Sequence, residues 1–351
     1  MMKKLTGILM SSLFLISAVW AAGGTTVDPN MEQLGMRLYN DKNMSFNGTQ
    51  SCRNCHHHFS GFADITNHLD PYANFVSTGA DGVSKGGRNA PSAAYAGYSP
   101  ILKKKSSEWV GGMFWDGRAA GWVLGDPLAE QAQGPPLNPV EMGMPDKQTV
   151  INVINDSDYR DLWITVFGSG SLGDAEAAYD NFGRAIAAFE RSTDVTKFSS
   201  KFDVAQLSDV EQAGQVLFEA NCASCHSTTA AFGAEAPLFT NYKYANLGVP
   251  ANPEIPSEGA DLDLGLGPVV DDDAQNGKFK IPTLRNIALS APYSHNGLFP
   301  TLMEMLQFIN NRSDFTPEVP YNLSEDVGNL GLSQEALENI EAFLMTLTDD
   351  Y

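Results

Sequence analysis

The sequence predicts a mainly α-helical protein of two related domains with long ordered loops. Three observations lead to this fold class. A cysteine motif and the apolar segment before it occur twice, apolar residues recur at helical spacing in other segments, and strand patterns are scarce. The length agrees, because 351 residues are enough for about two domains.

Helices are predicted where apolar side chains return to one face every three or four residues. The segments Leu34–Tyr39 and Ala213–Phe218 share this spacing, and each precedes one of the two cysteine motifs. Ala175–Arg191 also places its apolar residues on one face. Near the end of the chain, Ser333 can cap a helix that runs through Thr346.

Pro-rich and Gly-rich stretches separate the predicted helices, notably Gly134–Pro145 and Gly248–Gly267. The helical periodicity is interrupted near residue 200 by polar residues, among them Ser199, Ser200, Lys201 and Asp203. We therefore predict an N-terminal domain over residues 23–200 and a C-terminal domain over residues 201–351.

The first residues have the pattern of a cleaved signal peptide. Lys3 and Lys4 precede the apolar stretch Leu5–Trp20, and four small residues follow. A retained anchor is the alternative, since about 18 apolar residues suffice to span a bilayer. We expect a signal peptide over residues 1–22 and a mature chain in the periplasm, without a membrane anchor.

The chain is strongly acidic, with a formal net charge of -20. Cleavage would remove Lys3 and Lys4 and make the mature chain more acidic still. Such a surface repels nucleic acid and anionic lipid, which argues against nucleic-acid-binding functions. It would attract a basic protein partner.

The four cysteines form two Cys-x-x-Cys-His motifs, Cys52–His56 and Cys222–His226. This spacing is typical of haem c attachment, because two thiols one helical turn apart can bond to the vinyl groups of one haem while the adjacent His ligates iron. Redox disulfides or a single zinc ion are alternatives, but neither explains a His after both pairs. The predicted haem-binding residues are Cys52, Cys55, His56, Cys222, Cys225 and His226.

Three further histidines follow the first motif. His57 and His58 are expected on the solvent side of the attachment loop, with a ligand role as the alternative. His68 is either a solvated loop histidine or, in one state of the protein, a second iron ligand.

A loop after residue 130 offers the two groups that peroxide chemistry requires beside an open iron position. Gln131 supplies an amide, and Glu141 supplies a carboxylate that can move a proton between the two peroxide oxygens. Three prolines between them stiffen the backbone. Many surface loops contain these residue types, so an ordinary loop remains the alternative on spacing alone.

With these motifs in place, the sequence resembles the bacterial diheme cytochrome c peroxidase family, which includes the diheme enzyme that matures the tryptophan-derived cofactor of methylamine dehydrogenase. The resemblance covers nearly all of the mature chain, in order. The matching segments are Ser51–His56, Arg88–Pro91, Phe114–Ala119, Gln131–Met142, Ala185–Arg191, Cys222–His226, Ile281–Asn286, Ala291–Gly297, Gly328–Leu332 and Phe343–Asp349.

The resemblance implies two cytochrome c-like domains with different tasks. The N-terminal haem, with His56 as proximal ligand, would react with peroxide, and the C-terminal haem, with His226 as proximal ligand, would receive electrons. Glu141 matches the family's acid/base carboxylate, Gln131 its distal glutamine, and Trp115 the tryptophan between the two haems.

The resemblance also implies a calcium ion between the haems. Its ligands would be the Asn89 side chain and the backbone carbonyls of Ser290 and Pro292, although the family more often has Thr at the Ser290 position. The chain also departs from the family by several extra residues at 121–127. Trp122 in this insertion is a second relay candidate or an ordinary tryptophan.

A further departure concerns the second haem. The family usually has a Met or Tyr iron ligand fourteen residues after the histidine that matches His295, and this chain has Ile309 there. Met305 lies one turn earlier and is the candidate ligand, with Met303 nearby. The alternatives are that both methionines only fill the core, or that this haem is five-coordinate or ligated from elsewhere.

Three residues of the matching segments have two interpretations. Arg118 and Arg285 could bind haem propionates or tie loops together. His295 is expected to be a structural histidine that forms hydrogen bonds and does not ligate iron.

The sequence therefore predicts an enzyme that reduces hydrogen peroxide to water with electrons from a small donor, such as a c-type cytochrome or cupredoxin. One alternative is a diheme oxidase that modifies Trp or Tyr residues of a partner protein. A second is an electron carrier without enzymatic activity. A homodimer is left open.

Overall fold

The computed structural model describes residues 28–255 and 262–351, so the predicted signal peptide lies outside the described residues. Its α-helices are α1 (Pro29–Asn40), α2 (Cys52–Cys55), α3 (Ile65–Leu69), α4 (Pro127–Ala132), α5 (Gly134–Leu137), α6 (Lys147–Asp156), α7 (Arg160–Phe167), α8 (Ala175–Glu190), α9 (Lys201–Val204), α10 (Asp209–Asn221), α11 (Gly267–Val270), α12 (Leu302–Asn310) and α13 (Gln334–Met345). The 3-10 helices are η1 (Lys42–Met44), η2 (His58–Ser60), η3 (Ala96–Tyr98), η4 (Asp273–Gln275) and η5 (Ile287–Leu289). The strands are β1 (Lys103–Lys105), β2 (Glu108–Val110), β3 (Tyr244–Ala245) and β4 (Phe279–Lys280).

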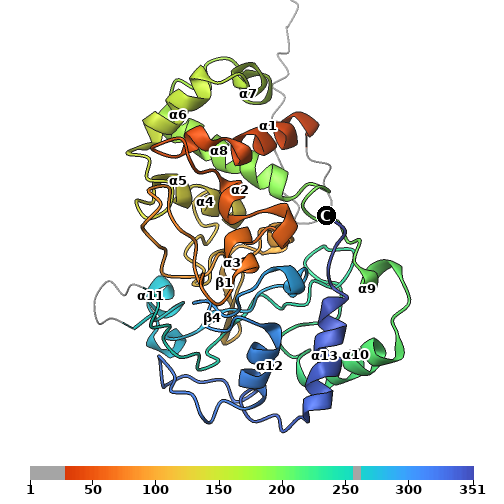
Figure 1. Ribbon diagram of the computed structural model, residues 1–351. Helices are drawn as coiled ribbons and strands as arrows, with labels where there is room; N and C mark the ends of the chain where they lie inside the picture. Colours follow the sequence, from red (N-terminus) through yellow and green to blue (C-terminus); the bar gives the residue numbers. More distant parts are fainter. Residues whose placement is uncertain (1–27, 256–261) are drawn as a thin grey trace, which may run out of the picture.

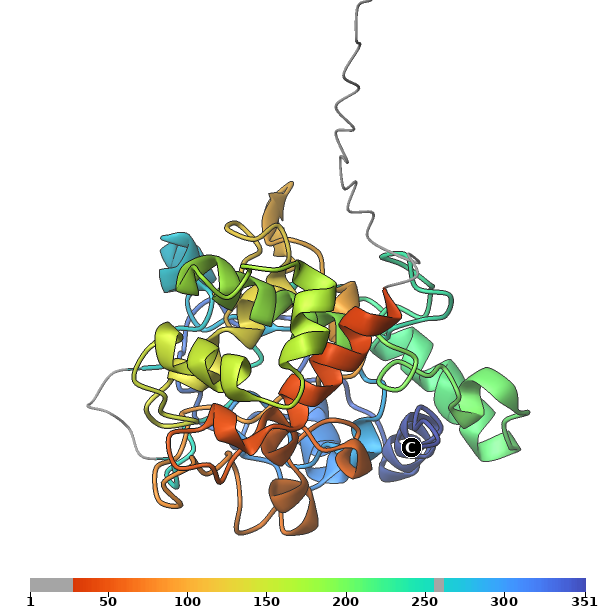
Figure 2. The same ribbon diagram turned by 90° about the horizontal axis from the view of Figure 1, so that it is seen from above.

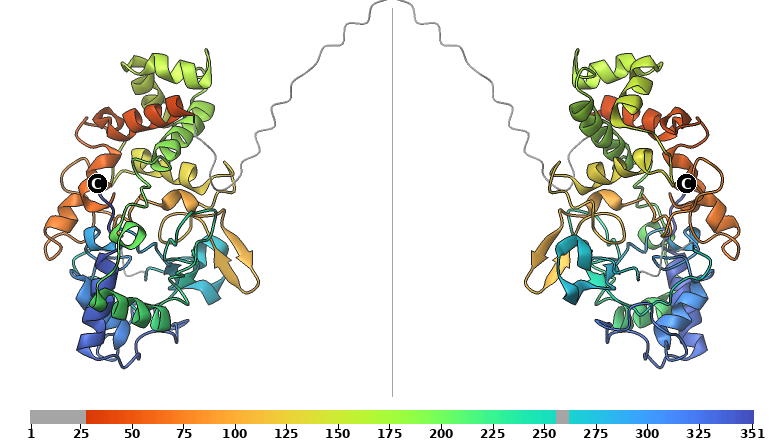
Figure 3. Two further views of the ribbon diagram at one scale, coloured as in Figure 1. Left: turned by 90° about the vertical axis from the view of Figure 1, so that its right-hand side faces the viewer. Right: turned by 90° about the vertical axis from the view of Figure 1, so that its left-hand side faces the viewer.

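The two halves of the chain form two lobes, the first above the second in Figure 1. Helices α6 and α7 cover the outer end of the N-terminal lobe (Figure 2). The antiparallel hairpin β1–β2 projects beside α11 (Figure 3), and β3 pairs with β4. These few short strands among helices confirm the predicted mainly α fold. None of the described helices is long and apolar enough to cross a bilayer.

The two apolar segments that precede the cysteine motifs lie in α1 and α10, and each of these helices crosses another helix in the same way. Helix α1 packs across α8 in one lobe, and α10 packs across α13 in the other. A Cβ atom on Gly35 would lie 1.9 Å from the Ala185 carbonyl oxygen, and one on Gly214 would lie 1.8 Å from the Asn339 carbonyl oxygen. The two backbones therefore touch at both crossings, which only glycine permits.

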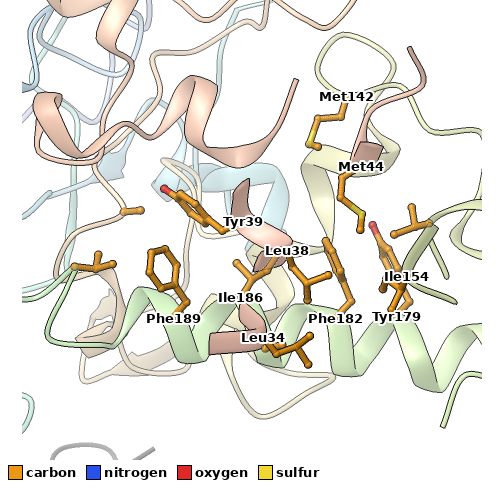
Figure 4. Packing of buried hydrophobic residues seen from close by; sticks show 14 of the residues in the cluster. Leu34, Leu38, Tyr39, Met44, Met142, Ile154, Tyr179, Phe182, Ile186 and Phe189 are labelled. Atoms are coloured by element: carbon orange, nitrogen blue, oxygen red, sulfur yellow. The ribbon is translucent and has the colours of Figure 1, made fainter. Parts of the chain in front are cut away.

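The core of the N-terminal lobe fixes the first cysteine motif. Figure 4 shows the α1 residues Leu34, Leu38 and Tyr39 against the α8 residues Phe182, Ile186 and Phe189. The Tyr39 ring lies 5.0 Å from that of Phe189, and its hydroxyl donates a 2.7 Å hydrogen bond to the His56 carbonyl. The packed helix pair thus holds the chain directly at the end of α2.

The last residues of the chain join the two lobes. The buried Asp349 carboxylate accepts hydrogen bonds from the Tyr95 hydroxyl (2.7 Å) and the Asn286 amide (3.0 Å). The Tyr351 hydroxyl donates to the Val195 carbonyl at 2.8 Å. The tail after α13 thereby bonds to segments of both lobes, which restrains them relative to one another.

Candidate functional site

The two motif histidines have the same hydrogen-bond arrangement. Nδ1 of His56 lies 3.1 Å from the Phe62 carbonyl oxygen, and Nδ1 of His226 lies 2.8 Å from the Phe239 carbonyl oxygen. A carbonyl only accepts, so each Nδ1 carries the proton and each Nε2 keeps its lone pair for a metal. Burial lowers the pKa of His226 to about 4 and also lowers that of His56, which favours the neutral form that binds iron.

The four cysteines are free thiols, with one pair in each lobe. Burial raises the pKa of Cys55 and of Cys222 to about 12. The described residues contain no group of three or more His, Cys, Asp and Glu that could hold a metal ion. The structure thus favours neither alternative to haem attachment: the disulfides are not formed, and the two pairs do not meet around one zinc ion.

A cavity begins at the second motif and extends toward the N-terminal lobe. Cys222, Cys225 and His226 line it, together with Trp115 and Asn89, and most of its other walls are apolar. Two thiols, one imidazole with a free Nε2 and an apolar enclosure are what a covalently bound haem requires. The residues present therefore fit a haem c group.

The predicted acid/base residue lies close to the first motif. Glu141 is half-buried, and its charge contributes to the raised pKa values of Cys52 and Cys55. Its Oε1 accepts a 2.7 Å hydrogen bond from the Asn138 amide. Burial raises the pKa of Glu141, while that hydrogen bond and the Arg118 charge act in the opposite direction. A carboxyl with a raised pKa is suited to both accepting and donating a proton.

The loop between the predicted catalytic groups is partly helical. Two of the three prolines that predict a stiff loop, Pro135 and Pro136, stand at the start of α5, where the missing N–H costs nothing, and Pro139 follows the end of this helix. Its backbone is bonded to a neighbouring loop, because Ala80 N donates to the Glu141 carbonyl at 2.7 Å. A Cβ on Gly79 would lie 2.5 Å from the Val140 carbonyl oxygen. Glu141 is therefore held on both sides.

Gln131 lies on α4, and charged neighbours tie this helix to residues 121–127. Glu130, the residue before it on α4, accepts hydrogen bonds from the backbone N–H groups of Gly121 (2.6 Å), Val123 (2.7 Å) and Leu124 (2.8 Å). Asp126 caps α4 and binds both terminal nitrogens of Arg191 at 2.6 and 2.9 Å. These bonds explain how the chain accommodates the extra residues without releasing α4.

We expect Glu130→Ala to release the insertion and destabilise the N-terminal lobe by about 1–3 kcal/mol, because it leaves three backbone donors without their acceptor. Limited proteolysis should cut within residues 121–127 sooner than in the parent protein. The matched control is Glu176→Ala on α8, whose side chain is 75% exposed. Equal cleavage rates in both variants would contradict this role of Glu130.

Trp115 lies at the junction of the lobes. Its Nε1 donates to the Asn89 carbonyl at 2.9 Å, and its own carbonyl accepts from the Lys280 N–H at 2.8 Å. Next to it, Asp116 binds Arg88 at 2.6 Å, and Arg88 also binds Asp263 of the C-terminal lobe at 2.7 Å. The tryptophan is therefore held between the two lobes. Trp122, by contrast, is 57% exposed and does not line the cavity.

The predicted calcium ligands Asn89, Ser290 and Pro292 line the same cavity. The Asn89 amide nitrogen donates a 2.6 Å hydrogen bond to the Pro292 carbonyl. A cation at this place would need the amide turned so that Oδ1 faces it. With that rotation, Asn89 would offer Oδ1 and free the Pro292 carbonyl oxygen, and oxygen ligands of this kind suit calcium.

The two arginines with open interpretations tie loops together. The Arg285 side chain is fully buried, binds Asp203 through Nη2 at 2.9 Å and donates to the Pro237 carbonyl at 2.8 Å. Arg118 binds Asp116 at 2.9 Å and lies over the Phe114 ring at 3.8 Å. Protein groups thus already engage both guanidinium groups.

The remaining histidines fall into three settings. The rings of His57 and His58 stack at 4.4 Å beside the exposed Arg53. His68 lies on α3, with its buried Nδ1 unbonded among the described residues. His295 stacks on Phe279 at 3.6 Å, but its Nε2 has no hydrogen-bond partner among the described residues.

Two buried charged residues were not singled out from the sequence. Lys280 lies in the cavity wall, bonded to the Gly112 carbonyl and the Ser99 hydroxyl, and burial lowers its pKa to about 7. Glu190 is buried near Cys52, and burial raises its pKa to about 8. The sequence pattern indicates the burial of Glu190, because this residue follows Ile186 by one turn on the apolar face of α8.

Known proteins are similar to this chain over most of its length. The profile described as "Di-haem cytochrome c peroxidase" matches residues 29–211, and the profile described as "Cytochrome c" matches residues 211–348. Methylamine utilization protein MauG of Paracoccus denitrificans is 35% identical over 99% of this chain and 96% of its own length. Cytochrome c551 peroxidase of Nitrosomonas europaea is 29% identical over 99% of this chain and 91% of its own length.

The crystal structure of the diheme peroxidase BthA from Burkholderia thailandensis is similar, with a TM-score of 0.83 and 28% identity. The match covers 92% of this chain and 87% of that chain. These similarities extend over both lobes and both cysteine motifs.

Proposed function

This chain belongs to the di-haem cytochrome c peroxidase family, and we propose that it reduces hydrogen peroxide to water in the periplasm with electrons from a small donor protein. Membership in this family makes it an oxidoreductase that carries two haem c groups, so the electron-carrier alternative is not retained. The proposed donor is a c-type cytochrome or cupredoxin with a basic surface, which the net charge of -20 favours.

The observation that carries the proposal is an asymmetry between the two motifs. Glu141, a carboxyl whose pKa burial raises, lies close to Cys52 and Cys55. At the second motif, the residues of α12 that line the cavity are all apolar. Proton transfer during peroxide cleavage needs an acid/base group, and Glu141 supplies one at the N-terminal site.

In this proposal each residue has a defined task. A bound haem supplies the iron that takes up peroxide and stores the electrons that reduce it. His56 would hold the N-terminal iron through Nε2, because its Nδ1 proton is fixed on the Phe62 carbonyl. Glu141 would take a proton from one peroxide oxygen and give it to the other, which would leave as water. Two electrons from the donor and two protons from solvent would convert the remaining oxygen into the second water, and Gln131 would orient the peroxide. Trp115 connects the two lobes for electron transfer.

A steady-state assay tests the proposal. Holoprotein supplied with a reduced small cytochrome and hydrogen peroxide should oxidise the cytochrome with a stoichiometry of two electrons per peroxide. Absence of turnover with any basic c-type cytochrome or cupredoxin, despite full haem loading, would contradict the proposed peroxidase function. The measurement must use the full chain, because the tail after α13 joins the lobes.

A second candidate function is oxidation of Trp or Tyr residues on a partner protein. Ile309 favours this second function, because the chain has isoleucine in the cavity wall at the second haem where the family usually has a Met or Tyr ligand. A relative named methylamine utilization protein is 35% identical to this chain. Covalent change in a partner, detected by mass spectrometry without cytochrome turnover, would favour this function over the first.

We also propose that calcium binds at Asn89, Ser290 and Pro292 and stabilises the contact between the lobes. The thermal unfolding midpoint of the holoprotein should then be lower in excess EGTA than in excess calcium, because a ligand that binds only the folded state stabilises it. Asn89→Ala should remove this difference. A midpoint that is the same in EGTA and in calcium would rule out the site.

A further inference from the structure

Helix α12 forms one wall of the cavity that contains His226. Its residues Leu302, Met305, Leu306 and Ile309 all line this cavity, and their spacing places them on one face of the helix. The His226 imidazole is held by residues outside α12. The Phe218 ring lies 6.5 Å from that of His226, and the Phe239 carbonyl accepts its Nδ1 proton. A haem held by His226 in this cavity would therefore lie beside the α12 wall.

Around Ile309, this wall consists of hydrocarbon side chains. Leucine and isoleucine have no lone pair to give to iron. Met303 is directed elsewhere, since its sulfur accepts a 3.7 Å hydrogen bond from the Gln334 amide of α13. Met305 alone brings a donor atom to the α12 wall, but long helical side chains point toward the N-terminus of their helix. A thioether at this position is therefore expected to extend toward the turn near Leu302, away from Ile309.

Several other polar groups that line the cavity are already engaged. The phenol of Tyr293 donates to the Ile287 carbonyl at 2.9 Å, and that of Tyr242 lies 3.3 Å from the Tyr95 carbonyl. The Lys280 ammonium is bonded to Ser99 and Gly112, and the His295 ring is stacked on Phe279. The exposed Asp326 lies at the rim. Tyr293, Tyr242 and Lys280 could approach the α12 wall only by losing these partners, whereas Nε2 of His295 has no hydrogen-bond partner among the described residues.

We propose that this chain places no ligand on the α12 side of its C-terminal haem, and that the apolar pocket closed by Ile309 binds a small uncharged molecule of the diatomic class, such as carbon monoxide, nitric oxide or dioxygen. An apolar pocket favours a neutral ligand, because burial of an anion without a partner is costly. The proposal rests on the two-haem assignment and does not depend on peroxidase activity.

Carbon monoxide binding to the dithionite-reduced holoprotein tests this inference. The haem content is first fixed by pyridine haemochrome, and carbon monoxide is then titrated to saturation. We expect two carbon monoxide molecules per chain, both in the parent protein and in Met305→Leu. Azide added to the oxidised protein should bind at only one haem. Carbon monoxide binding at a single haem of the parent protein would overturn the proposal.

Electron paramagnetic resonance of the oxidised protein provides the second measurement. Ile309→Met should add a low-spin signal and reduce carbon monoxide binding from two molecules per chain to one, whereas the matched control Ile309→Val should behave like the parent. If the parent shows a low-spin signal that Met305→Leu abolishes, Met305 is the ligand and the proposal is wrong. Peroxide turnover is not a readout here, so failure of the proposed function would leave this result unaffected.

Discussion

Glu141→Gln is expected to lower peroxide turnover by about two to four orders of magnitude while both haems stay attached. Gln has almost the same shape and can still bond to Asn138, so the loop that α5 and Ala80 hold should keep its position. What is lost is the group that accepts and returns the proton. The measurement is kcat with a saturating reduced cytochrome, alongside pyridine haemochrome for haem content.

The matched control is Glu219→Gln, an exposed carboxylate of α10 in the other lobe, which should leave turnover unchanged. If Glu141→Gln turned over peroxide at the parent rate, Glu141 would have no part in the mechanism. A large loss in both variants would point to a general effect of charge on donor binding.

The pH profile gives an independent check on the same residue. As a base, Glu141 must be ionised before it accepts a proton, and burial raises its pKa above that of an ordinary carboxyl. Activity should therefore be complete above this raised pKa and fall as the pH drops through it. In Glu141→Gln the remaining activity should lack this acid limb. An acid limb that persists unchanged would assign it to another group.

Arg285→Met is expected to destabilise the folded protein by about 3–5 kcal/mol, because it removes one partner of a buried ion pair. The Arg285 side chain is completely buried, and Asp203 opposite it is 9% exposed. Without the guanidinium, Asp203 keeps a charge that water cannot reach, and the Pro237 carbonyl loses its donor. Chemical denaturation of fully haem-loaded protein measures the change.

An exposed arginine provides the comparison. Arg37→Met removes a surface ion pair with Asp158, whose side chains are 43% and 76% exposed, and should cost less than about 1 kcal/mol. Equal losses in the two variants would contradict a special role for the buried pair. If Arg285→Met instead lost haem without losing stability, the result would favour the interpretation that Arg285 binds a haem propionate.

Much of the fold could be predicted because its signals are local. The two Cys-x-x-Cys-His motifs need only one helical turn each, and the apolar spacing of Ala175–Arg191 predicts the long helix that is observed as α8. The sequence shows a glycine in each apolar segment before a cysteine motif, but it does not show why glycine is needed there. Gly35 and Gly214 are required by carbonyls of Ala185 and Asn339, which lie more than one hundred residues away in the chain.

By itself, the sequence determined that two haem-binding motifs occur in a mainly helical, acidic chain, because covalent attachment depends on neighbours within five residues. Only the tertiary structure decided which charged groups are already paired. Arg285 could hold a propionate or a loop until Asp203 was seen against it, and Trp122 could be a relay until its exposure was known. Pairing and burial depend on residues distant in the chain, and a linear sequence does not specify those distances.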